Sequence, residues 1–321
     1  MTTCCSWYNV RCTAFGQVIA VDLSGNNLVG QLPDNFNSFA TLVTVDFSYN
    51  QLSGSLPPSL GSAPNLQNIN FDVNHLSGQL PPTLSTLVNL TTIHFKNNSI
   101  TGSIPDTWST LTRLTSIYGS NNQLNGPFPS VVTNMTALTN LYLDNNQFSG
   151  TLPPAVGQMV NLQALNLKLN FFMGNIPDVW NTLTNLTDLD LSNNRLTGQL
   201  SQNVSNWGNM QTLMIGYNSL SGSVPTQLGQ LNSLQFLQIN FNAFNGQFPP
   251  GAAPAALGYC FASPNQFQIC PDPSVANDPN SLAFQCSLDC NLYQTASSDA
   301  SALARSPLSL AIFFLAYLFL M

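Results

Sequence analysis

The chain has 321 residues, a formal net charge of -7 and only 6% charged residues, against roughly a quarter in typical globular proteins. All of its 13 acidic residues are Asp, and Lys plus Arg total only 6. Amphipathic helices take their polar faces from Glu, Lys and Arg, so a mainly helical fold is excluded. The lack of a basic cluster also argues against nucleic acid as a partner.

The cysteines are confined to the two ends of the chain. They are Cys4, Cys5, Cys12, Cys260, Cys270, Cys286 and Cys290. This distribution predicts an N-terminal cap at residues 1–17 and a C-terminal cap at residues 252–295, both stapled by disulfides in an oxidising compartment. Neither end has the paired C-x-x-C spacing of a zinc site, so we expect no metal and no cofactor.

Between the caps, residues 18–251 form ten repeats of 24 residues without an insertion. An asparagine marks each repeat: Asn26, Asn50, Asn74, Asn98, Asn122, Asn146, Asn170, Asn194, Asn218 and Asn242. Glycine follows four residues later every time, and proline seven residues later except at Ser201. Such a fixed period predicts stacked coils that share one continuous core.

Within each repeat, apolar residues alternate with polar ones just before the asparagine, as Leu141 and Leu143 do. This alternation predicts a half-buried strand. We expect the asparagine to be buried and to satisfy backbone groups of neighbouring coils. The glycine permits a backbone conformation closed to other residues, and the proline starts an extended return path outside a sheet.

The unit LYLDNNQFSGTLP (141–153) resembles the plant-type extracellular leucine-rich repeat. The segment CCSWYNVRC (4–12) resembles the N-terminal cap of that family, with Asn9 in place of a glycine. The resemblance implies an α/β-type repeat solenoid: a curved right-handed superhelix with a parallel sheet on the concave face. Coil and short 3-10 turns would form the convex face. Surface antigens of some flagellate protozoa, which combine similar 24-residue repeats with an apolar C-terminal tail, are a second family that the chain resembles.

The resemblance also implies a cysteine pairing. In the family, the first of the two adjacent cysteines bonds to an earlier cysteine, which here would precede Met1. We therefore expect Cys5 to pair with Cys12, Cys4 to stay unpaired, and the N-terminal cap to be truncated and without its signal peptide. The last four cysteines would pair among themselves, with three connectivities open.

The concave face is the expected ligand-binding surface, because two polar columns of each strand point outward there. We expect the contacts to come from its middle: His94, Lys96, Tyr118, Tyr142, Asp144 and Lys168. Aromatic rings beside hydrogen-bonding groups are typical of recognition surfaces. The alternative is that the tyrosines reflect ordinary strand propensity.

Other features favour structural interpretations. Asp22 and Asp46 share a column and are expected to be two hydrated carboxylates, while His75 and His94 lie too far apart to share a metal. No catalytic motif accompanies them, so we expect no enzyme. Gly119, at a buried strand position, predicts a bulge or a small void.

A second apolar group lies toward the C-terminal repeats. Its members are Phe171, Met214, Phe236 and Phe241. We interpret it as the margin that the C-terminal cap covers.

Five N-x-[ST] sequons permit glycosylation: Asn89, Asn97, Asn134, Asn185 and Asn203. Residues 296–321 read as a spacer and a hydrophobic attachment signal for a glycosylphosphatidylinositol (GPI) anchor. The apolar run Leu308–Met321 spans only about 21 Å as a helix, short of a bilayer core. Ser298 is the expected attachment residue, followed by Asp299. A short single-pass membrane anchor is the alternative.

Together these features predict a non-enzymatic recognition scaffold on the extracellular face of the plasma membrane. It would bind a protein, peptide or glycan as co-receptor, adhesin or decoy, since no signalling domain follows the repeats. The alternatives are an inhibitor of extracellular polysaccharide-degrading enzymes, as the polygalacturonase-inhibiting proteins of this repeat type are, or a structural coat protein.

Overall fold

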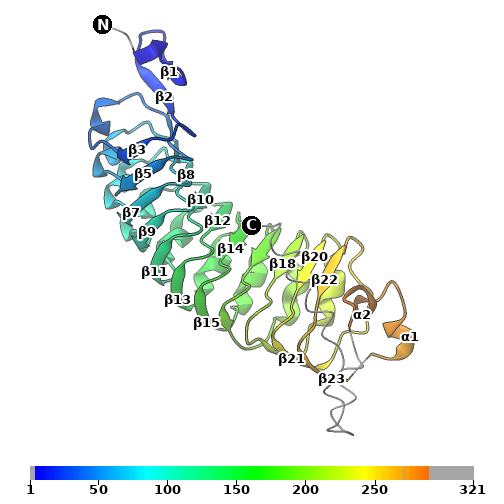
Figure 1. Cartoon of the computed structure of the whole chain (residues 1–321). Helices are drawn as coiled ribbons and strands as arrows, with labels where there is room; N and C mark the ends of the chain where they lie inside the picture. Colours follow the sequence, from blue (N-terminus) through cyan, green and yellow to red (C-terminus); the bar gives the residue numbers. More distant parts are fainter. Residues whose placement is uncertain (1–3, 270, 289–321) are drawn as a thin grey trace.

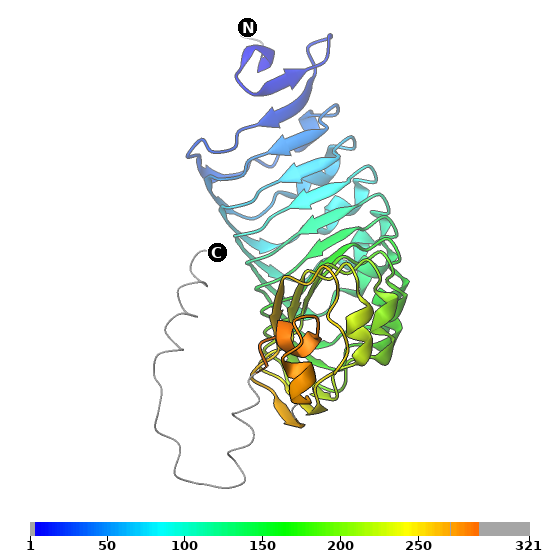
Figure 2. The same ribbon diagram turned by 90° about the vertical axis from the view of Figure 1, so that its right-hand side faces the viewer.

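The computed structural model describes residues 4–269 and 271–288. They form a curved stack of coils, one for each repeat, with the N-terminal cap at one end (Figure 1). We number the coils by their marker asparagines, from coil one at Asn26 to coil ten at Asn242. A long sheet lines the concave side of the curve, and short 3-10 helices form the opposite side (Figure 2).

The concave sheet has twelve strands and is parallel throughout, apart from the antiparallel first pair. Its strands, in spatial order, are β1 (Val10–Cys12), β2 (Val18–Asp22), β4 (Thr44–Asp46), β6 (Asn68–Asn70), β8 (Thr92–His94), β10 (Ser116–Tyr118), β12 (Asn140–Tyr142), β14 (Ala164–Asn166), β16 (Asp188–Asp190), β18 (Thr212–Met214), β20 (Phe236–Gln238) and β22 (Tyr259–Phe261). From β2 to β20 each residue pairs with its equivalent 24 positions later. Equivalent side chains therefore form straight columns.

A second layer of parallel strands follows the marker asparagines, and the sequence patterns did not foresee it. One sheet contains β3 (Val29–Gln31), β5 (Gln51–Gly54), β7 (His75–Gln79), β9 (Ser99–Gly102), β11 (Gln123–Pro127), β13 (Gln147–Thr151), β15 (Phe171–Gly174) and β17 (Arg195–Leu196). A smaller one contains β19 (Ser221–Gly222), β21 (Ala243–Gln247) and β23 (Gln266–Ile269). In the repeats that have the proline, these strands end before it, and proline lacks the N–H that a ladder needs. Strand β17 ends before Ser201, which takes the place of proline in its repeat.

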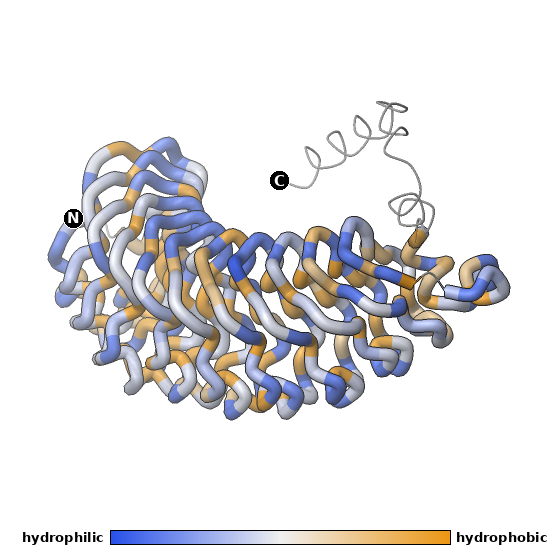
Figure 3. Tube along the Cα trace, turned by 90° about the horizontal axis from the view of Figure 1, so that it is seen from below, coloured by the Kyte–Doolittle hydropathy of each residue, from blue (hydrophilic) through white to orange (hydrophobic). Residues whose placement is uncertain are grey.

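The remaining helices are short. The 3-10 helices span Cys4–Ser6, Phe36–Ser38, Pro58–Ser62, Pro82–Thr86, Asp106–Thr110, Ser130–Asn134, Pro154–Gln158, Asp178–Thr182, Gln202–Asn206 and Thr226–Gln230, and the cap adds α1 (Pro273–Ala276) and α2 (Leu282–Gln285). Within the described residues, no helix is long and apolar enough to cross a membrane. Apolar residues recur at the same places in successive coils (Figure 3) and pack into one continuous core along the solenoid.

The marker asparagines form the ladder that holds neighbouring coils together. Asn146 is 6% exposed. Its Nδ2 donates to the carbonyls of Gly119, Leu143 and Asp144 at 2.9–3.1 Å. Its Oδ1 accepts from the backbone N–H of Leu124, one coil earlier, at 3.0 Å. The same pattern recurs from Asn50 to Asn242. Each of these asparagines thus satisfies backbone groups of two coils that would otherwise lack a partner. The prediction is wrong for Asn26, which is exposed and whose side-chain amide, among the described residues, donates only to the Ser24 carbonyl of its own coil.

The C-terminal cap contains an eleventh coil that the sequence reading assigned wholly to the cap. Asn265 repeats the ladder contacts: its Nδ2 donates to Ile239 and Ala262, and its Oδ1 accepts from the N–H of Phe244. Strand β22 extends the concave sheet. This coil escaped prediction because its asparagine comes 23, not 24, residues after Asn242.

The caps carry the described disulfides. Cys5 bonds to Cys12, and Cys4 is a free thiol. Cys260 bonds to Cys286 and so ties β22 to the residue after α2. Cys270 and Cys290 lie outside the described residues.

Gly119 produces neither a bulge nor a void, so the prediction made from the sequence is wrong here. Strand pairing continues in register on both sides of it. A Cβ added at Gly119 would lie 2.6 Å from the Phe95 ring and 3.2 Å from Leu143. The glycine is needed because the Phe95 ring fills the space of its missing side chain.

We expect Asn146→Ala to destabilise the solenoid by about 1–3 kcal/mol, because it leaves buried backbone groups unpaired. Thermal and denaturant melts of the full-length chain measure the loss. Asn125→Ala is the control, since the exposed Asn125 amide bonds only within its own turn. Equal melting of the two variants would contradict the role given to the ladder.

Candidate ligand-binding face

Three aromatic side chains stack in the middle of the concave sheet. His94, Tyr118 and Tyr142 are direct partners on β8, β10 and β12. The His94 and Tyr118 ring centroids are 4.2 Å apart, and those of Tyr118 and Tyr142 are 5.1 Å apart with an interplanar angle of 11°. Both faces of the Tyr118 ring are therefore covered by neighbouring rings.

Asp72 anchors the N-terminal side of this stack. Its side chain is only 5% exposed and lies 3.5 Å from His94 Nδ1 and 3.5 Å from Lys96 Nζ. It also accepts from the Lys96 backbone N–H at 2.7 Å. This carboxylate fixes the position of one ring and one cation on the face.

An acidic group lies on the other side of the stack, in coils six to eight. Ser120 Oγ donates to Asp144, and the Oγ and N–H of Ser192 donate to Asp190 at 2.6 and 2.9 Å. Burial raises the pKa of Asp144 and of Asp190, while Lys168 partly opposes the rise in both. Burial also raises the pKa of Tyr142, with Tyr118 and then Asp188 as further causes.

The structure brings the six residues expected at the site together on neighbouring strands, from coil four at His94 to coil seven at Lys168. Sequence reasoning missed Asp72, Asp188 and Asp190 as members of this surface. Asp72 and Asp190 stand in the two outward columns already read from the sequence, which could have identified them. Their burial could not be predicted from the sequence, because it depends on side chains of neighbouring columns that pack around them.

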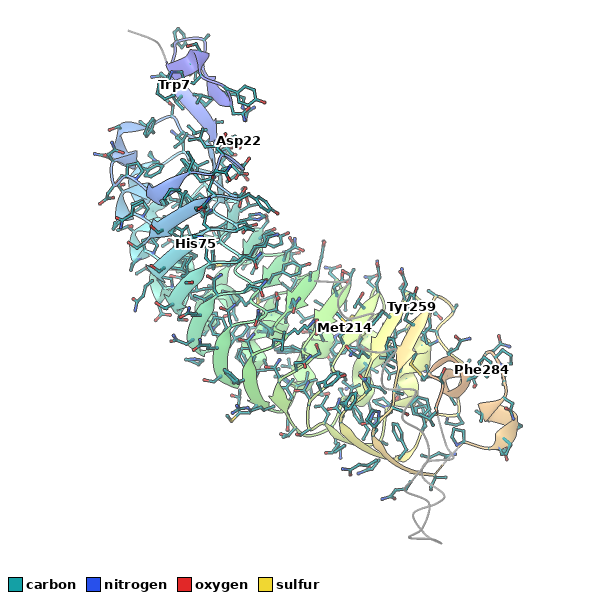
Figure 4. The ribbon with its side chains drawn as sticks, in the orientation of Figure 1. Trp7, Asp22, His75, Met214, Tyr259 and Phe284 are labelled. Carbon is teal, nitrogen blue, oxygen red and sulfur yellow. A yellow bond between two sulfur atoms is a disulfide. The ribbon has the colours of Figure 1, made fainter. Side chains whose placement is uncertain are left out.

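The remaining polar candidates have separate places. Asp22 and Asp46 pair across β2 and β4, and each accepts from the serine two residues later. His75 lies on β7 in the second layer (Figure 4), whereas His94 lies on β8 of the concave sheet. Among the described residues, no three His, Cys, Asp or Glu side chains cluster as metal ligands.

The sequons differ in how their amides are engaged. Asn89 and Asn185 donate to the carbonyls of Pro64 and Val160 in the preceding coil. Asn185 is exposed all the same, as are Asn97, Asn134 and Asn203. Attachment of a glycan at Asn89 or Asn185 would alter contacts between coils.

The second apolar group is a margin of the cap only at Phe236, which packs against Tyr259 and Phe261 of the cap; the prediction is wrong for its exposed members. Phe171 lies on β15 in the second layer and is 42% exposed, and Phe241 is 45% exposed. Met214 and Phe236 belong to the concave strands β18 and β20. The described part of the cap leaves the face open and adds two exposed rings, Tyr259 and Phe261.

Comparison with family models matches the leucine-rich repeat at residues 17–39, 41–63, 89–111 and 137–159, and again at 184–244. The fold is a leucine-rich-repeat solenoid. The curated protein sequences contain no match.

Several solved structures are similar to this solenoid. The plant peptide hormone receptor RGFR1 in complex with RGF2 has 32% identity and a TM-score of 0.71, over 72% of this chain and 37% of the receptor chain. The Arabidopsis thaliana receptor kinase ectodomain GASSHO1/SCHENGEN3, in complex with CASPARIAN STRIP INTEGRITY FACTOR 2, has 31% identity and a TM-score of 0.71, over 78% and 33%.

The Arabidopsis receptor kinase HAESA, in complex with the peptide hormone IDA and the co-receptor SERK1, has 25% identity and a TM-score of 0.70, over 83% and 53%. The solenoid thus resembles extracellular ectodomains of plant receptors, whose fold is typically a non-catalytic binding scaffold. It spans only about a third to a half of their length.

The raised pKa of Asp190 predicts a pH-dependent stability. The folded chain holds the Asp190 proton at a pH at which the unfolded chain has released it, so this contribution to stability falls as pH rises above 3.8 through the raised pKa. Asp190→Asn should therefore melt with the native chain near pH 4 and above it at pH 7. The exposed variant Asp106→Asn is the control. A temperature difference that does not grow with pH would contradict the assignment.

Proposed function

We propose that this protein binds an extended peptide outside the cell through its concave face, as a co-receptor, adhesin or decoy. The main support for this proposal is the stack of His94, Tyr118 and Tyr142, in which the two outer rings cover both faces of the Tyr118 ring. Sugars are commonly held against open aromatic ring faces, and both faces of the Tyr118 ring are occupied. Ring edges, phenol groups and flanking charges remain, and these suit the amides and side chains of a peptide.

The surroundings of the stack support the same ligand class. Lys96 and Asp72 lie on one side, and Lys168, Asp144 and Asp190 lie on the other. Fixed charges of both signs along a straight face discriminate between peptide side chains. The similar plant receptors are described in complex with peptide hormones, which favours a peptide over a glycan.

To test this function, the full-length chain is immobilised and screened against a combinatorial library of peptides. We expect enriched peptides to lose about tenfold or more in affinity for Tyr142→Ala, since aromatic anchors contribute one to a few kcal/mol. Tyr8→Ala removes a tyrosine that is 88% exposed in the N-terminal cap and should bind normally. A library with no enriched peptide would overturn the proposal and favour the enzyme-inhibitor or coat-protein alternative.

We further propose that a GPI anchor at Ser298 attaches the protein to the outer surface of the plasma membrane. Residues 296–321 lie outside the described part of the chain, so this proposal is based on the sequence alone. Small residues, a short polar spacer and a terminal apolar run occur in the order that an anchor signal requires.

Phosphatidylinositol-specific phospholipase C should release the protein from intact cells. A double variant, Ser298→Phe with Asp299→Phe, should not be released, because bulky residues block attachment. Recovery of mature native protein that still contains peptides from residues 308–321 would disprove anchoring and favour a short membrane-inserted segment.

A further inference from the structure

The C-terminal end of the concave face is uncharged and aromatic. No Asp, Glu, Lys, Arg or His occurs from Leu196 to Pro271. Across coils nine to eleven the outward and edge positions hold Met214, Tyr217, Phe236, Phe241, Tyr259 and Phe261, which we call the aromatic end. Met214 and Tyr259 lie along the same side of the curve (Figure 4).

The rings of the aromatic end form two exposed groups. Phe236 lies 5.9 Å from Tyr259 and 5.7 Å from Phe261 between ring centroids, at tilted angles. Tyr217 and Phe241 stack at 4.4 Å along the edge of the sheet. Tyr259 is 66% exposed, and the described cap leaves it so. An apolar cluster of this extent is typical of an interaction site.

The edge rings are held in an unfavourable backbone conformation. Tyr217 and Phe241 have φ angles of 56° and 53°. Asparagine, which tolerates this left-handed region, occupies the equivalent position in coils four to six and eight, and glycine occupies it in coil one, while Tyr49, Val73 and Leu169 occupy it in coils two, three and seven. The left-handed conformation is thus shared by all ten coils, and only at the aromatic end do aromatic residues occupy this position in two successive coils.

Two buried side-chain oxygens in coils ten and eleven of the aromatic end lack a hydrogen-bond partner. They are Asn240 Oδ1 and Ser263 Oγ. Both residues stand two positions before the ladder asparagine of their coil, so they share one column. Asn240 is 8% exposed, and its Oδ1 lies beside Gly216 in the floor of coil nine. An unpaired buried acceptor favours a ligand that brings an N–H donor.

The concave face is acidic in coils six to eight and becomes uncharged toward the aromatic end. On the concave face, coils six to eight carry Asp144, Asp188 and Asp190 with the cation Lys168, whereas Arg195 lies on β17 in the second layer. Coils nine to eleven carry no charged residue. A complementary chain would place a basic residue over the acidic coils and a large apolar side chain over the aromatic end, continuous with the central stack.

We propose that the aromatic end holds an aromatic or large aliphatic side chain of the peptide, with a basic residue three or four positions away over Asp188 and Asp190 of coil eight. This inference rests on the proposed peptide-binding function. Phe236 and Phe261 lie two and three coils beyond Asp190, about 10–14 Å at about 4.8 Å per strand. An extended peptide covers that distance in three or four residues, at about 3.3–3.6 Å each.

A set of synthetic peptides tests the spacing. Each carries one Arg and one Phe in a Gly/Ser chain, separated by one to eight positions, and binding to the full-length protein is measured by fluorescence anisotropy. We expect the tightest binding at a separation of three or four, and about a tenfold loss when the Phe is replaced by Gly. Tyr259→Ala and Phe236→Ala should abolish that dependence on Phe, while Phe15→Ala, at a ring 91% exposed in the other cap, should preserve it.

The outcomes separate this inference from the proposed function. One result would overturn the inference alone. In that result, the library peptides bind and lose affinity for Tyr142→Ala, but the affinity of the designed peptides does not depend on the Phe, on its spacing or on Tyr259→Ala. If no peptide of either kind binds, both fail. Sedimentation showing a dimer that Tyr259→Ala converts to monomer would also overturn it, because a second copy would then occupy the aromatic end. Binding of vesicles but not of peptides would also overturn the inference, because a lipid would then occupy the aromatic end.

Discussion

The constraint on which this structure depends is the buried asparagine that links each coil to its neighbours. Its amide donates to carbonyls of two coils and accepts from a backbone N–H of the preceding coil, as Asn146 does with Gly119, Leu143 and Leu124. One side chain thus replaces several backbone partners that a tight coil could not otherwise provide. Because the asparagines from Asn50 to Asn242 make the same contacts, the coils stack in register without drift.

The register explains how the fold positions a recognition surface. Each outward residue lies directly beside its equivalent 24 positions later, so separate repeats build continuous columns. The stack of His94, Tyr118 and Tyr142 exists only because three coils place rings at the same position. The acidic group and the aromatic end follow from the same columns, further along the solenoid.

Much of this architecture could be predicted from the sequence, because the 24-residue period is written in residues that the coil requires. The marker asparagines identified the ladder, and the alternation of apolar residues identified the concave strands. Asn265 was missed since it breaks the period by one residue, although its contacts are those of the ladder. The second layer of strands was missed because its residues do not show the alternation of apolar and polar residues that predicts a strand.

The site was less predictable, because burial depends on neighbours in space. Asp190 stands in a column whose side chains point out of the concave sheet, yet it is only 6% exposed in the structure. Gly119 reads as a defect, yet it makes room for the Phe95 ring of the adjacent coil. The apolar group containing Phe171 and Phe236 reads as one margin, yet its members lie on two different sheets.

Native-state hydrogen exchange tests the ladder most directly. The backbone N–H groups of Leu124 and Phe148 have a side-chain acceptor, Asn146 Oδ1 or Asn170 Oδ1, as their hydrogen-bond partner. If the asparagines hold the coils together, these N–H groups should exchange as slowly as the paired N–H groups of β10 and β12, with the free energy of unfolding the surrounding coils. Fast exchange at Leu124 and Phe148 beside slow exchange in those strands would contradict the account.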